Sequence, residues 1–255
     1  MSTVMKESID QLLRRCVSNS RSRIEFWIDF IRSTQVKRMV EIGVYEGDFA
    51  VDILRHSENV SKYYMIDPWR HLADWNKPAN QDDGRFEKMF QSVMSKTDFA
   101  RSRRVILRGK TVDVIDQISD GELDFAYIDG DHTLRGITID LIRAYPKVRS
   151  DGFIGGDDFS PTIWSHKTAF EPTIVFPFAV YFAEAVGATI YALPNIQFLI
   201  HKTVTPQFGF VDLTGRYSDF SIRSHVEPQK MLKLYLGEKF PRLLLAFRSA
   251  RKLVS

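Results

Sequence analysis

Cysteine is almost absent from this sequence of 255 residues, which contains only Cys16. A single cysteine cannot form an internal disulfide or a pair of thiolate metal ligands, so the sequence predicts a protein of a reducing compartment. Any metal ion would have to be bound by oxygen atoms or by imidazole nitrogens.

The sequence also lacks a strong excess of either charge and any long apolar segment. Lys and Arg number 35 against 32 Asp and Glu, and a net charge of +3 is too small to indicate a nucleic-acid-binding protein. No stretch approaches the roughly 18 apolar residues of a membrane span. Lys6, Glu7 and Asp10 interrupt the segment where a signal peptide would be apolar. With 44% hydrophobic residues, we expect a cytoplasmic globular protein that does not bind nucleic acid.

Short apolar runs alternate with helical patterns over the middle of the chain. The runs, rich in β-branched and aromatic residues, predict strands at 38–42, 63–66, 105–107, 123–128 and 153–155. Apolar residues at three- and four-residue steps predict helices between them at 47–56, 85–99, 111–118 and 134–147. Strands that are apolar on both faces and joined by helices predict a doubly wound α/β fold with a mostly parallel sheet.

Three further segments complete the predicted organisation. A helix at 176–186 precedes strands at 189–193 and 197–201, and the turn between these strands is too short for a parallel crossover. The last strand of a seven-stranded sheet should therefore be antiparallel to its neighbour. We expect an α/β domain over 37–202, a helical N-terminal cap over 1–36 that breaks near Asn19-Ser20, and a basic C-terminal extension over 203–255.

Glycines follow the first predicted strand, in the segment MVEIGVYEGDFA. Gly43 and Gly47 would allow a ligand to approach the backbone, where the next helix presents unpaired amides. Glu41 lies just before them, and Asp67 at the end of the second strand could accept hydrogen bonds from the two hydroxyls of a ribose. These residues predict a nucleotide-like ligand; an ordinary tight turn and a loop-capping aspartate are the alternatives. The absence of GxGxxG disfavours a nicotinamide-dependent oxidoreductase.

Acidic residues end the fourth and fifth predicted strands. Asp129 ends the fourth strand, with Asp131 and His132 two and three residues after it, and Asp157 and Asp158 end the fifth. Because parallel strands bring their carboxyl ends to one edge, three carboxylates should converge there, and such a cluster needs a cation to stay ionised. Oxygen ligands favour Mg²⁺ or a similar ion. The alternative is that these aspartates only cap loops.

A resemblance to a known enzyme family rests on four motifs taken together, in their order and at their separations along the chain. These motifs are EIGVYEG, YYMIDPW, LDFAYIDGDHTLRGITIDL and GFIGGDDF. Over residues 38–201 the chain resembles a class I S-adenosylmethionine-dependent methyltransferase. Within that class it is similar to the metal-dependent sugar O-methyltransferases of macrolide and aminocoumarin biosynthesis (macrocin and mycinamicin type). The resemblance implies a Rossmann-like methyltransferase fold, S-adenosyl-L-methionine as methyl donor, a divalent cation such as Mg²⁺, and a small-molecule or glycan acceptor.

The resemblance also implies roles for individual residues. Those that would bind the cofactor are Glu41, Gly43, Tyr45, Gly47, Asp67, Gly109, Lys110 and Asp129. Those that would hold the metal are Asp129, Asp157 and Asp158. The base in these relatives lies two or three residues after the first metal ligand, which indicates Asp131 or His132. An imidazole with its ordinary pKa of about 6.5 suits a base at neutral pH, and Asp131 could act directly or orient His132.

The acceptor is less defined than the cofactor. Catechol-type relatives commonly have a lysine where this chain has His132 and an asparagine where it has Asp158, which favours a sugar or another aliphatic diol here. A catechol-like phenolic acceptor and a non-catalytic module that acts through its helical termini are the alternatives. We expect the acceptor to contact segments 69–84 and 160–178, with the aromatic residues Trp69, Trp75, Trp164 and Phe170.

Positive charge gathers at the end of the chain. Residues 216–255 contain nine Lys or Arg and three Asp or Glu, a net charge of +6. The segment PRLLLAFRSARKLVS, residues 241–255, predicts an amphipathic helix. This helix could contact anionic lipid at the inner face of a membrane, or pack against the body or a partner subunit of a homo-oligomer.

Overall fold

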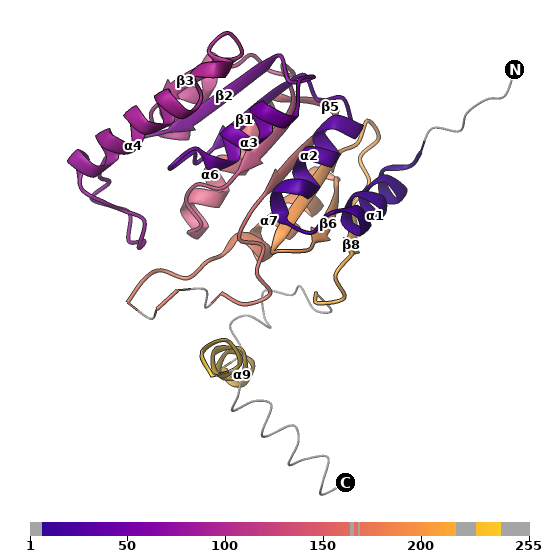
Figure 1. The fold of residues 1–255 in the computed structure, drawn as a ribbon. Coiled ribbons are helices and arrows are strands. Elements are labelled where there is room, and N and C mark those ends of the chain that lie inside the picture. The colour runs from indigo at the N-terminus through magenta and orange to yellow at the C-terminus, as the bar shows by residue number, and fades with distance from the viewer. Residues whose placement is uncertain (1–6, 164–165, 168, 218–227, 241–255) are drawn as a thin grey trace, which may run out of the picture.

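A mixed β-sheet with helices on both faces forms the body of the protein (Figure 1). The computed structural model describes residues 7–163, 166–167, 169–217 and 228–240. In these ranges the sheet has eight strands in the order β3-β2-β1-β4-β5-β7-β6-β8. The strands are β1 (Arg38–Ile42), β2 (Lys62–Asp67), β3 (Arg104–Arg108), β4 (Leu123–Ile128), β5 (Val148–Gly156), β6 (Thr189–Leu193), β7 (Gln197–Lys202) and β8 (Gly209–Asp212).

The strands are parallel except for β7, which runs antiparallel to both β5 and β6. The predicted doubly wound α/β fold is thereby confirmed, including the direction of the last of the seven predicted strands. An eighth strand, β8, was not predicted and pairs in parallel with β6. Its four residues are only half-buried at the edge of the sheet, and so short a run does not establish a periodicity.

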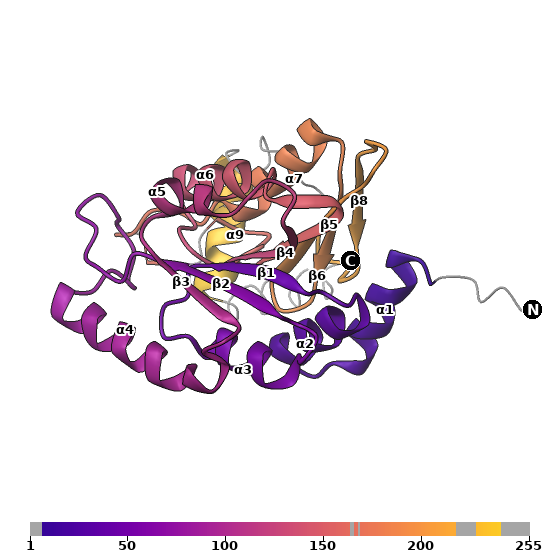
Figure 2. The same ribbon diagram turned by 90° about the horizontal axis from the view of Figure 1, so that it is seen from above.

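Helices bury both faces of the sheet (Figure 2). One face is covered by α1 (Ile9–Asn19), α2 (Arg23–Ser33), α3 (Asp48–His56) and α4 (Asp83–Lys96). The opposite face is covered by α5 (Thr111–Val114), α6 (Leu134–Ala144) and α7 (Val175–Val186). Successive strand residues point to opposite faces, so Met39 enters the first core and Val40 the second.

The helix α2 packs directly on the sheet. The interruption between α1 and α2 falls at the predicted position. Ser22 caps α2 by accepting a hydrogen bond from the backbone amide of Glu25. Trp27, Phe30 and Ile31 are completely buried. The indole of Trp27 lies 5.3 Å from the rings of both Phe125 and Tyr127, measured between centroids. This packing fixes the N-terminus of α2 near the carboxyl ends of β4 and β5.

The C-terminal part is described only as far as residue 240. Helix α9 (Pro228–Lys239) contacts the body where Lys239 Nζ donates to the carbonyl oxygen of His166 at 2.9 Å. Leu232 and Leu236 on α9 are exposed, as is Phe240. The predicted amphipathic helix at 241–255 lies outside the described residues. Within the described ranges, every helix is too short or too polar to cross a lipid bilayer.

Candidate active site

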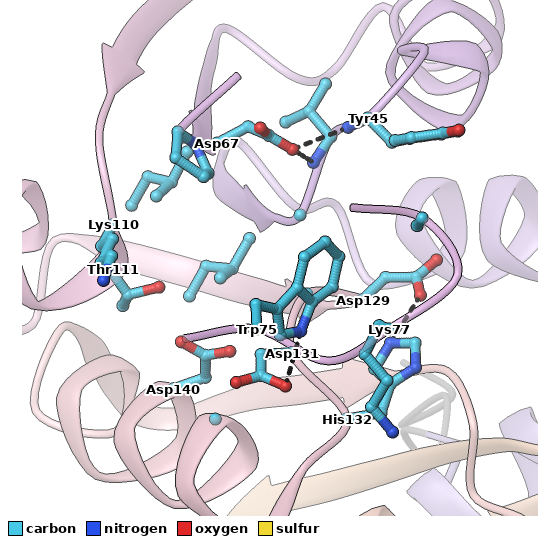
Figure 3. A pocket seen from close by; sticks show the side chains of 18 of the residues that line it. Tyr45, Asp67, Trp75, Lys77, Lys110, Thr111, Asp129, Asp131, His132 and Asp140 are labelled. Atoms are coloured by element: carbon cyan, nitrogen blue, oxygen red, sulfur yellow. Dashed lines mark hydrogen bonds and ion pairs between the residues drawn. The ribbon is translucent and has the colours of Figure 1, made fainter. Parts of the chain in front are cut away.

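A cavity of about 690 Å³ lies at the carboxyl ends of β1, β2 and β4 (Figure 3). All but one of the predicted site residues line it, namely Glu41, Gly43, Tyr45, Gly47, Asp67, Gly109, Lys110, Asp129, Asp131, His132 and Asp158. The exception is Asp157, which lies beside Arg23. The parallel strands therefore bring the separate motifs of the sequence to one place.

The turn after β1 presents its backbone to the cavity. Gly43 has a φ of 89°, and a Cβ atom at this position would overlap the carbonyl group of Asp129, so only glycine fits. Gly47 has a φ of 76° and is the N-cap of α3. No side chain among the described residues caps this helix, which leaves its first amides available to a ligand.

Asp67 joins the turns that follow β1 and β2. Its Oδ2 accepts hydrogen bonds from the amides of Val44 at 3.0 Å and Tyr45 at 2.9 Å, and its Oδ1 accepts one from the amide of Trp69 at 2.7 Å. Burial raises the pKa of Asp67, whereas these backbone amides lower it. Oδ1 has the capacity for one more hydrogen bond, so Asp67 can shape the turn and also contact a ligand.

Glu41 lies within β1 at the base of the cavity and is 2% exposed. The hydroxyl of Tyr63 donates a hydrogen bond of 2.7 Å to its Oε2. Burial raises the pKa of Glu41 well above its usual value, although this hydrogen bond opposes the shift. A protonated Glu41 could donate a hydrogen bond to a ligand as well as accept one.

The loop after β3 and one face of α6 line another part of the cavity. Gly109 and Lys110 lie in this loop, directly before Thr111 at the start of α5. Asp140 of α6 is 5% exposed and lines the same region. Burial raises the pKa of Asp140 to about 7, although a hydrogen bond from Thr111 opposes the shift. Asp140 was not identified as a site residue from the sequence. It could have been found as an aspartate on the apolar face of a predicted helix.

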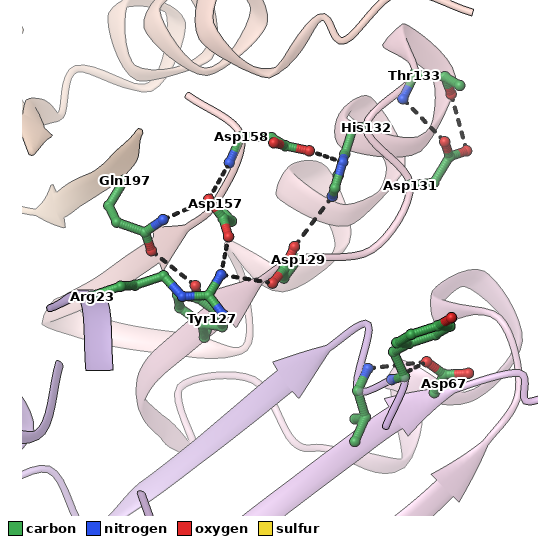
Figure 4. A network of polar contacts seen from close by, with 12 residues as sticks. Arg23, Asp67, Tyr127, Asp129, Asp131, His132, Thr133, Asp157, Asp158 and Gln197 are labelled. Carbon is green, nitrogen blue, oxygen red and sulfur yellow. Dashed lines mark hydrogen bonds and ion pairs between the residues drawn. The ribbon is translucent and has the colours of Figure 1, made fainter. Parts of the chain in front are cut away.

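The acidic residues that end β4 and β5 are held in a network with Arg23 (Figure 4). Arg23 is the first residue of α2, and its guanidinium forms an ion pair with Asp157 and lies 3.5 Å from Asp129 Oδ2. Gln197 of β7 donates from Nε2 to Asp157 Oδ1 at 2.6 Å. Burial and the neighbouring Asp129 raise the pKa of Asp157 to about 6, although Arg23 opposes the shift.

His132 lies between the carboxylates of Asp129 and Asp158 (Figure 4). Its Nδ1 forms an ion pair with Asp158, and its Nε2 is 3.3 Å from Asp129 Oδ1. Burial acts to lower the pKa of His132, but its contacts with Asp129 and Asp158 raise it to about 10. Burial acts to raise the pKa of Asp158, but His132 lowers it below its usual value. At neutral pH His132 is therefore a cation.

Asp131 is separate from this network and faces the cavity. Its Oδ1 accepts hydrogen bonds of 3.0 Å from the indole N–H of Trp75 and from the amide of Thr133. Its Oδ2 accepts a hydrogen bond of 3.0 Å from the Thr133 hydroxyl. These contacts fix the orientation of the carboxylate at the start of α6 (Figures 3 and 4).

The arrangement does not fit the Mg²⁺ site that the resemblance implies. Three carboxylates are a suitable set of hard ligands, and the two strand ends do bring them to one edge. However, Arg23 lies against Asp129 and Asp157, and His132 lies against Asp129 and Asp158. Among the described residues, no three side chains of His, Cys, Asp or Glu are placed to hold one metal ion.

The two segments predicted to contact the acceptor meet at the cavity. Lys77, which is 6% exposed, donates from Nζ to the carbonyl oxygens of Glu171 at 2.7 Å and Pro172 at 3.2 Å. Trp75 lines the cavity, whereas Trp69 is completely buried and does not line it. The remaining two predicted aromatics differ in status, since Phe170 is half-buried and Trp164 lies outside the described residues.

Residues 40–159 match the model of a family described as a methyltransferase domain. This match covers slightly less than half of the chain, and the predicted Rossmann-like fold of class I S-adenosylmethionine-dependent methyltransferases is confirmed by solved structures that share it. None of the curated proteins matches the chain.

Solved structures of methyltransferases share this fold. A protein provisionally named a caffeoyl-CoA O-methyltransferase from Staphylococcus aureus has a TM-score of 0.53 and 16% identity, over 76% of this chain and 93% of that one. A similarly provisional O-methyltransferase from Klebsiella pneumoniae has a TM-score of 0.51 and 16% identity, over 79% and 93%. The O-methyltransferase from Bacillus cereus, solved with S-adenosylhomocysteine (SAH), has a TM-score of 0.50 and 14% identity, over 78% and 94%.

Proposed function

We propose that this protein transfers a methyl group from S-adenosylmethionine to a hydroxyl of a sugar or of a glycosylated metabolite. The observation that carries the proposal is the single cavity that joins the glycine turn of β1, Asp67 of β2 and the fixed carboxylate of Asp131. The methyltransferase-domain match supports methyl transfer. The O-methyltransferases among the structural relatives support oxygen as the acceptor atom.

The chain's own residues fit an adenosyl ligand. Gly43 and Gly47 bring the backbone to the cavity surface, and the first amides of α3 are available to polar groups of the ligand. Oδ1 of Asp67 would accept a hydrogen bond from a ribose hydroxyl, and Lys110 and Asp140 would lie near the adenine ring of the ligand. When bound, S-adenosylmethionine supplies an electrophilic methyl group on a positively charged sulfur.

Asp131 is the residue that we assign as the general base. Methyl transfer is an in-line displacement, so the enzyme must align a hydroxyl and accept its proton. Hydrogen bonds from Trp75 and Thr133 hold the Asp131 carboxylate at the cavity. Both ring nitrogens of His132 face carboxylates, so this residue keeps its proton at neutral pH and is unsuited to accept another.

The acceptor class is proposed from the lining of the cavity. Trp75 offers an apolar ring beside polar groups from Asp131, Lys77 and Arg135, a combination that suits a sugar, which has both apolar faces and hydroxyls. A catechol-like phenolic is the competing acceptor, and it is favoured by the name of the relative from Staphylococcus aureus.

Calorimetric titration with SAH and a radiolabelled methyl-transfer screen over glycans and phenolics test the proposal. We expect SAH to bind and label to appear in a glycan or glycoside. If label appears only in phenolics, the proposed acceptor is wrong and a catechol-like phenolic takes its place in the proposal. The absence of SAH binding by the folded protein would contradict the proposed activity altogether.

A further inference from the structure

Asp129, Asp157 and Asp158, at the ends of β4 and β5, each contact a basic side chain of the same chain. Arg23 is shared by Asp157 and Asp129, and His132 is shared by Asp129 and Asp158 (Figure 4). Asp129 is thus the central member, because one of its oxygens faces the guanidinium and the other faces the imidazole. The guanidinium offsets part of the negative charge of the cluster, and the imidazole ring lies between Asp129 and Asp158.

The chain holds Arg23 in this position from several directions. Arg23 begins a helix whose Trp27 is completely buried against the sheet. The indole N–H of Trp27 donates to Gln197 Oε1 at 2.8 Å, and the Tyr127 hydroxyl donates to the same oxygen at 2.9 Å. Gln197 in turn donates to Asp157, the ion-pair partner of Arg23. The guanidinium and its acceptor therefore belong to one network that is anchored in the core.

Asp157 has little remaining capacity for a metal ion. Its Oδ1 accepts hydrogen bonds from Gln197 Nε2 at 2.6 Å and from the amide of Asp158 at 2.7 Å, while its Oδ2 faces Arg23. A carboxylate oxygen has about two lone-pair positions, so Oδ1 is fully used. A divalent cation would have to displace the guanidinium to reach Oδ2, and the His132 ring occupies the space between Asp129 and Asp158.

We propose that Arg23 takes the place of a divalent cation at this acidic cluster, so that the protein binds no metal there. Arg23 is a positioning residue: it neutralises Asp129 and Asp157 and keeps the ends of β4 and β5 together beside the cavity. A guanidinium is permanently charged and has a planar set of donors, which suits it to pairing with two carboxylates. The inference goes beyond the proposed function, because it concerns the cation and not the methyl transfer.

The decisive experiment is a titration of the full chain with Mn²⁺, followed by electron paramagnetic resonance of the free ion. Three proteins are compared: the wild type, Arg23→Ala, and Arg32→Ala as a control that removes an exposed arginine from the same helix. We expect no specific binding by the wild type or by Arg32→Ala. Arg23→Ala leaves Asp129 and Asp157 without the guanidinium, and we expect it to bind one ion at least about tenfold more tightly than the wild type.

Each outcome of the titration decides the proposal. Binding of one Mn²⁺ per chain by the wild type would overturn it, and this measurement needs no variant. If neither the wild type nor a folded Arg23→Ala protein binds Mn²⁺, Arg23 is not a substitute for a cation. Circular dichroism checks the folding of the variant, and Arg23→Gln serves if Arg23→Ala does not fold. The titration uses neither methyl donor nor acceptor, so its result is independent of the proposed function.

Discussion

The two sides of the cavity are built in different ways. The side formed by β1 and β2 depends on backbone groups. Gly43 fits against Asp129, the N-terminus of α3 has no side-chain cap, and the Asp67 carboxylate accepts hydrogen bonds from three nearby amides. The side formed by β4 and β5 depends on side chains, which come from α2, β7 and the loop before α6.

This difference shows how each side meets its electrostatic requirement. The backbone side presents amide dipoles to a ligand and needs few side chains, so its motif is short and continuous in the sequence. The side-chain side must neutralise partly buried carboxylates, and it does so with Arg23, which is 134 residues away from Asp157. We expect changes on the backbone side to affect cofactor binding and changes at Asp131 to affect chemistry.

The largest expected effect is that of Gly43→Ala. The added Cβ would overlap the carbonyl group of Asp129 and push apart the turns after β1 and β4, so we expect SAH binding to weaken by about 100-fold or more. Calorimetry measures the change. Gly121→Ala is the matched control, since Gly121 also has a positive φ but has open space around its Cβ position. Equal SAH affinity in both variants would break the assignment of the cofactor to this turn.

Asp131→Asn should separate chemistry from cofactor binding. The amide can keep part of the contacts with Trp75 and Thr133 but cannot accept a proton, so we expect kcat to fall by about 10² to 10⁴-fold. SAH affinity should remain near that of the wild type, because Asp131 lies on the other side of the cavity from Asp67. Steady-state methyl-transfer rates provide the measurement. An unchanged kcat would remove Asp131 from the role of base.

Asp140→Asn should change the stability of the protein rather than ligand binding or chemistry, and its effect should depend on pH. The folded protein raises the pKa of Asp140 from 3.8 to about 7, so the folded state holds this proton more tightly than the unfolded chain does. The resulting stabilisation is complete below about pH 4 and is lost as the pH rises through 7. The wild type should therefore lose stability relative to Asp140→Asn over this range, by about 1.4 kcal/mol per unit of pKa shift at most.

Urea unfolding at pH 5 and at pH 8 measures this difference. Asp120→Asn is the control, because the Asp120 side chain is 72% exposed. A constant difference between wild type and Asp140→Asn at the two pH values would show that Asp140 is not a buried titrating group.

Much of the fold follows from local sequence pattern. The strands at 38–42, 123–128 and 189–193 have the predicted bounds, since each is an apolar run with clear punctuation at both ends. The short strand β8 was missed because two apolar residues at a sheet edge do not form a recognisable run. Helix α2 was predicted, but its burial against Phe125 and Tyr127 depends on the final packing of the sheet.

The candidate site divides in the same way. The glycine turn, the acidic strand ends and their meeting at one edge could be predicted from local patterns, because parallel strands joined by helices deliver their carboxyl ends together. Which cation lies among those acids depends on the three-dimensional packing. Arg23 and Gln197 reach Asp157 through packing of distant elements, and the same contacts that enclose His132 keep it protonated. Charge balance in a partly buried cluster depends on neighbours in space, which no local sequence pattern reveals.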